Sequence, residues 1–132
     1  MKRWLIAMVF GAMAAASWQV EASTKDYRLL TVAGYLNFYL LNLNACQDFH
    51  PAVRQSAYQA EAQLYPWLEK LQTRIEASND FDSAMLSGIV MRRRAMLNEQ
   101  IEDNDFTVDH CQAIVQILST EGLDETLLSV LN

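Results

Sequence analysis

LLTVAGYLNFYLLNLNAC, residues 29–46, is the most apolar stretch of the chain after residue 22, and it decides the fold. Its apolar side chains recur every three or four positions, which is the spacing of one face of an α-helix. Leu30, Phe38 and Leu41 lie outside that face, so we expect other helices to cover this one on more than one side. Three asparagines interrupt the stretch, and its apolar run is shorter than the roughly twenty residues that cross a membrane. We therefore predict a buried core helix and no membrane span in the mature chain.

The first 22 residues have the pattern of a secretory signal peptide. Lys2 and Arg3 provide a positive start, Trp4–Ser17 is almost wholly apolar, and small or modest residues precede Ser23. This order is typical of a signal peptide, and an apolar run of about fourteen residues is too short for a retained anchor. We expect cleavage after residue 22, a single mature domain of residues 23–132, and a periplasmic or secreted location.

The chain has two cysteines, Cys46 at the end of the opening stretch and Cys111 near the C-terminus. Two cysteines in an exported chain of this size most simply form one disulfide. A Cys46–Cys111 bridge closes a loop of about 65 residues, which stabilises the fold by about 4 kcal/mol in the chain-entropy description. The alternatives are an intermolecular bridge or two free thiols. No C-x-x-C motif is present, which disfavours a thiol oxidoreductase.

The chain is acidic, with a formal net charge of −6 at pH 7. Removal of residues 1–22 makes it more acidic, because that segment holds two basic residues and one acidic residue. Nucleic-acid phosphates require a basic face, and anionic lipid surfaces attract basic segments. The charge therefore argues against both nucleic acid and anionic lipid as partners, and it would suit a basic one.

The segment after Cys46 predicts a second helical region. Pro51 occupies a typical first helical position, and apolar residues then recur at helical spacing up to Ser78. Pro66 lies inside this pattern, where it removes a backbone hydrogen bond. We expect a kinked helix, or two short helices that meet near Tyr65.

The second half of the chain predicts a long helix over residues 79–101, a shorter one over 107–118 and a last one over 124–131. Thr107 is a good N-cap, and Gly122 can end the helix before it in the left-handed conformation. No period-two pattern or hairpin signal indicates a strand. The sequence predicts an all-α, single-domain bundle of four or five helices around the buried first helix, stapled by one disulfide.

The two histidines of the chain, His50 and His110, each lie close to a cysteine in the sequence. The disulfide would bring them to one end of the bundle, together with Asp48 and Asp109. Two imidazoles and two carboxylates can bind zinc or copper. Against this, no H-x-x-x-H or H-E-x-x-H spacing is present, and helix starts often carry polar residues. A metal site is the lesser interpretation, and no cofactor is predicted.

Arg92, Arg93 and Arg94 form the one basic cluster of the sequence. At 100° per residue, Arg93 projects near the middle of the apolar stripe of its helix, and Glu61 projects at the edge of another stripe. An isolated buried charge is costly, so the simpler interpretation is an Arg93–Glu61 ion pair or an arginine that reaches solvent. The functional interpretation is an anion site in a cleft, or an arginine anchor in an interface.

Catalytic motifs are lacking in the sequence. A serine nucleophile would need G-x-S-x-G or an equivalent turn, and oxidised cysteines are not nucleophiles. We expect an exported, non-catalytic binding protein of the cell envelope, which engages a protein partner through a helical face that includes the three arginines. The alternatives are a small-ligand or metal-binding domain, an envelope stress chaperone and, least favoured, a small hydrolase with paired carboxylates. In size, export signal and single disulfide, the chain is similar in outline to small helical periplasmic proteins such as acid-stress chaperones and toxin-immunity proteins.

Overall fold

The computed structural model describes residues 27–132, so the signal peptide expected over residues 1–22 lies outside the described residues. Within this range the chain is 83% helical and has no strand, which confirms the predicted all-α bundle. In chain order its elements are a first helix Tyr27–Phe49, η1 Pro51–Val53, α2 Arg54–Ala62, α3 Tyr65–Ala77, α4 Ser83–Glu102, α5 Val108–Thr120, α6 Glu125–Leu128 and η2 Ser129–Leu131.

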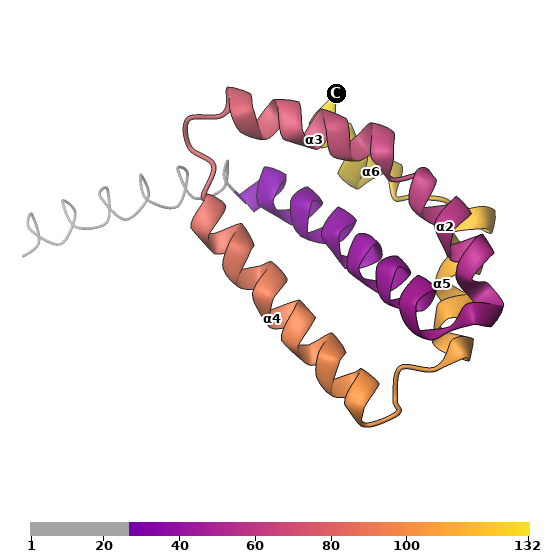
Figure 1. The fold of residues 1–132 in the computed structure, drawn as a ribbon. Coiled ribbons are helices and arrows are strands. Elements are labelled where there is room, and N and C mark those ends of the chain that lie inside the picture. Colours follow the sequence, from indigo (N-terminus) through magenta and orange to yellow (C-terminus); the bar gives the residue numbers. More distant parts are fainter. Residues whose placement is uncertain (1–26) are drawn as a thin grey trace, which may run out of the picture.

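The first helix, called the central helix below, runs through the middle of the bundle. It lies between α4 on one side and α3 and α6 on the other (Figure 1). By length and composition it is the one described helix that could cross a membrane, and 50% of its most apolar window is buried inside the protein. Val32, Leu36 and Leu43 are fully buried, as expected for a core helix. Leu30 is buried too, but Phe38 is 40% exposed, so one side of the helix is less fully covered than its sequence predicts.

The helices begin and end at the local signals that the sequence predicts. Pro66 stands in the first turn of α3, and the chain forms two helices that meet in a short turn rather than one kinked helix. The Thr107 hydroxyl accepts a hydrogen bond from the His110 amide (3.2 Å) and caps α5. Gly122 follows α5 with φ +74°, in the left-handed region that favours glycine. The break at Pro66 brings the number of α-helices to six, against the four or five predicted.

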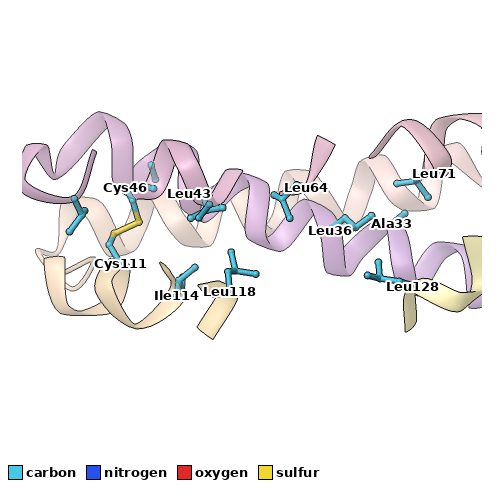
Figure 2. Packing of buried hydrophobic residues seen from close by; sticks show 14 of the residues in the cluster. Ala33, Leu36, Leu43, Cys46, Leu64, Leu71, Cys111, Ile114, Leu118 and Leu128 are labelled. Atoms are coloured by element: carbon cyan, nitrogen blue, oxygen red, sulfur yellow. A yellow bond between two sulfur atoms is a disulfide. The ribbon is translucent and has the colours of Figure 1, made fainter. Parts of the chain in front are cut away.

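The predicted Cys46–Cys111 disulfide is present. It joins the C-terminal part of the central helix to the first turns of α5, and both cysteines are fully buried (Figure 2). Positions 65 residues apart in the sequence are thereby held together at one end of the bundle.

The core is built unevenly around the central helix. Its buried apolar side chains come from the central helix itself, η1, α2, α3, α5, α6 and η2. Two more come from connections: Leu64 in the turn between α2 and α3 (Figure 2), and Phe106 before α5. The 20 residues of α4 include no buried side chain, although Leu86, Leu97 and Ile101 pack partly against the core. α4 therefore covers its side of the central helix without fully burying any of its own side chains.

Candidate binding groove

α4 is the one α-helix of residues 27–132 that has no buried residue. Its start is well defined, because the Asp82 carboxylate accepts a hydrogen bond from the Met85 amide (2.9 Å). Its three methionines are nevertheless open to solvent: Met85 is 43% exposed, Met91 69% and Met96 61%. A stable helix in a globular protein normally buries its apolar stripe. Much of the apolar surface of α4 is thus free to contact another molecule.

A groove runs between α4 and the central helix, which lie side by side and point in the same direction (Figure 1). Tyr27 and Met85 line one end of the groove, and Asn42 and Gln100 line the other. The groove consists of two clefts, a first cleft of about 520 Å³ and a second cleft of about 380 Å³. Arg93 lines both clefts and stands between them.

Arg93 crosses the groove from α4 to the central helix. Its Nη1 donates a hydrogen bond to the carbonyl oxygen of Gly34, and its guanidinium carbon lies 6.0 Å from the centre of the Phe38 ring. A Cβ atom on Gly34 would lie 3.5 Å from this Nη1, so a large side chain there would displace the guanidinium. A guanidinium has five N–H donors, and the Gly34 oxygen is neutral. The half-buried positive charge of Arg93 therefore keeps donors for an anionic ligand.

The predicted ion pair between Arg93 and Glu61 does not form in the described chain. Glu61 is buried in α2, only 7% exposed, and its carboxylate accepts a 2.6 Å hydrogen bond from the Tyr65 hydroxyl. This hydrogen bond raises the pKa of Tyr65. α2 lies across the central helix from α4 (Figure 1), so Glu61 and Arg93 each take a nearer partner.

The other two arginines of the cluster have different positions. Arg92 and Arg94 are both exposed; Arg92 lines the first cleft, whereas Arg94 lines neither cleft. Positive charge is therefore concentrated at the middle of the groove. Exposed acidic residues lie near both ends of α4: Asp80, Asp82, Glu99, Glu102 and Asp103.

Gly88 keeps the first cleft open. It lies in the interior of α4 and lines the cleft, and a Cβ atom added to it would meet nothing within 4 Å. A glycine inside a helix costs about 0.5–1 kcal/mol relative to alanine. Since alanine would fit, packing within the described chain does not explain the glycine. Its effect is to leave the α4 backbone accessible from the groove.

The second cleft has a neutral polar wall made by His110 and Asn42. The His110 Nε2 and the Asn42 Oδ1 lie 3.0 Å apart, and the Asn42 amide donates to the Phe38 carbonyl oxygen (2.9 Å). Burial lowers the pKa of His110, because desolvation disfavours the charged imidazolium. Near neutral pH this end of the groove therefore adds no positive charge to that of Arg93.

The two histidines do come to one end of the bundle, as expected from the disulfide. The ring of Phe106 lies beside both, with centroid distances of 5.5 Å to His50 and 5.3 Å to His110. The His50 Nε2 lies 2.8 Å from the Phe106 carbonyl oxygen, while Asp48 and Asp109 are exposed. In residues 27–132 no three His, Cys, Asp or Glu side chains are grouped to hold a metal ion. The part of the chain that the structure describes therefore adds no support to the metal interpretation, which stays a prediction.

Sequence reasoning singled out Arg93 but missed the residues that surround it. Gly34 and Gly88 stand inside helices, where glycine is unfavourable, and this local cost is the signal that marks them. Phe38 lies outside the apolar stripe of the central helix, which also distinguishes it. Asn42 has no comparable signal, since its role depends on His110, which is 68 positions away.

No known protein family, curated protein or solved structure matches this chain.

Proposed function

We propose that this chain is an exported, non-catalytic binding protein of the cell envelope, which engages a protein partner through the groove between the central helix and α4. The observation that carries the proposal is Arg93, a half-buried cation between the two clefts that donates a hydrogen bond to the neutral carbonyl oxygen of Gly34. Arginine at the centre of an apolar surface is typical of residues that dominate binding energy in protein interfaces.

The export part of the proposal rests on the disulfide and the N-terminus. A disulfide persists in oxidising compartments, and the buried Cys46–Cys111 bridge links the central helix to α5. The N-terminal sequence has the positive start and the apolar run of a signal peptide. Both features fit an exported protein.

A protein partner suits the groove better than a small ligand does. Small-ligand sites enclose most of the ligand surface. Here the rims are open: Phe38 is 40% exposed, Met85 43% and Met96 61%. Exposed methionines are frequent on surfaces that accept partner helices, because their flexible side chains adapt to the contact. The groove thus offers a long, adaptable contact surface.

Co-purification from envelope extract tests the proposal, with two matched methionine variants. Met96→Gln changes the second cleft, whereas Met91→Gln makes the same change on α4 outside both clefts. We expect the wild type and Met91→Gln to retain one stoichiometric partner on size exclusion. Met96→Gln should retain several-fold less of that partner. Equal loss with both variants, or no complex with the wild type, would contradict binding through the groove.

A further inference from the structure

We infer that the partner presents an amphipathic helix to the groove, with an Asp or Glu side chain on Arg93 and its backbone close to Gly88. This inference rests on the proposed function and specifies the chemistry of the occupant. Both concern the same groove, but partner binding alone does not require an acidic side chain on Arg93 or a partner backbone close to Gly88.

The shape of the groove fits a helix. The central helix and α4 run parallel, so the two clefts lie in line between them rather than side by side (Figure 1). On the central helix the groove extends from Tyr27 to Asn42, which is about 22 Å at 1.5 Å per residue. A helix of about fifteen residues covers that length, and helices bind such grooves through side chains spaced three or four positions apart.

Gly88 gives this helix a point of close approach. The missing side chain exposes the α4 backbone at the first cleft, and no atom of the described chain fills the space. Small residues at a helix crossing let two backbones come nearer than larger side chains allow. The partner helix should accordingly cross α4 over Gly88, one helical turn and a half before Arg93.

The charges of the groove select an acidic side chain at its middle. A carboxylate accepts two parallel hydrogen bonds from a guanidinium, which is the strongest pairing available to Arg93. Arg92 adds positive charge at the first cleft, and the acidic residues near the ends of α4 disfavour carboxylates there. The complementary helix is acidic at its centre, apolar on either side, and neutral or basic toward its ends.

A second copy of this chain is a poor occupant. Two-fold pairing of α4 with itself over its full length would place the arginines of one copy against those of the other, and like charges at close range repel. A copy shifted to bring Arg92 near Glu102 would leave the first cleft uncovered. The charge pattern therefore points to a different protein.

Site-specific photo-cross-linking in intact cells tests this inference. A photoreactive phenylalanine analogue at Met85, which lines the first cleft and is 43% exposed, labels whatever lies in the groove. We expect one cross-linked chain whose labelled segment is an apolar helix with a central Asp or Glu. Arg93→Glu should lower the cross-linking yield about tenfold or more, because the loss of hydrogen bonds between charged groups weakens binding by about that factor. Replacement of the partner's carboxylate by lysine should restore the yield with Arg93→Glu, and Arg94→Glu should leave it within about twofold of the wild type.

Each of the other possible outcomes refutes a specific claim about the partner or the groove. Absence of any cross-linked chain overturns both the proposed function and this inference. A cross-linked protein that is insensitive to Arg93→Glu, or whose segment lacks a carboxylate, leaves partner binding intact and refutes the carboxylate anchor. A cross-link to a second copy, or to a lipid, refutes the acidic partner helix. Gly88→Leu should abolish the cross-link while far-ultraviolet circular dichroism stays helical, and an unchanged yield would refute close approach at Gly88.

Discussion

Replacement of Gly88 by alanine should make the protein more stable. The position lies inside α4, outside the left-handed region, and the added Cβ meets nothing within 4 Å. Alanine restricts the unfolded chain and favours the helix, which together stabilise the fold by about 0.5–1 kcal/mol. For a domain of this size that corresponds to a rise in the melting temperature of about 2–8 °C. Thermal unfolding followed by circular dichroism measures the shift.

If Gly88 serves partner binding, a substitution there should change thermal stability and partner capture in opposite directions. Gly88→Leu should also keep or raise the melting temperature, because leucine is a good helix former and the cleft has room for it. It should nevertheless lower partner capture, since the side chain fills the first cleft. Ser87→Ala is the matched control: it improves helix propensity at an exposed neighbour outside the clefts and should leave capture unchanged. A fall in melting temperature with Gly88→Ala would refute the open space at this position and, with it, the reasoning.

Three further predictions concern the disulfide, the half-buried His110 and the buried carboxylate of Glu61. Paired replacement of Cys46 and Cys111 by serine should lower the free energy of unfolding by up to about 4 kcal/mol, measured by urea unfolding, because the bridge closes a 65-residue separation. His110 has a folded pKa below its ordinary value of 6.5, so the unfolded chain binds the proton more readily and stability should fall as the pH drops below about 6.5. His110→Gln should flatten that part of the pH profile, and an unchanged slope would argue against its burial. Glu61→Gln should lower the pKa of Tyr65 toward 10, as followed by its ultraviolet absorbance at alkaline pH, because the carboxylate that accepts its hydrogen bond is lost.

Most of the fold could be predicted because its determinants are local. The spacing of apolar residues, the proline at position 66, the Thr107 cap and Gly122 each act within one turn of the chain. The disulfide could be predicted because only two cysteines exist, so a single intramolecular pairing is available. These signals require no knowledge of how the helices are arranged.

The candidate site could be predicted only in part, because it depends on which helix faces which. A helical projection places Arg93 on the apolar face of α4 but cannot show that the central helix, rather than α2, lies opposite. The observed acceptor is the backbone carbonyl of Gly34. A glycine inside a helix marks that position in the sequence but does not show that Arg93 binds there. The convergence of His50 and His110 was predicted from the disulfide, but the aromatic ring of Phe106 beside both was not. Contacts between distant segments decide these points.

The central claim is that Arg93 binds the partner from within the groove. The most direct measurement is the amount of partner captured from envelope extract by Arg93→Gln relative to Arg94→Gln. The two variants remove the same charge from adjacent residues of α4, and of these two residues Arg93 lines the clefts whereas Arg94 does not. The account predicts a loss of about tenfold or more with Arg93→Gln and a change of no more than about twofold with Arg94→Gln. Equal capture by both variants would contradict it.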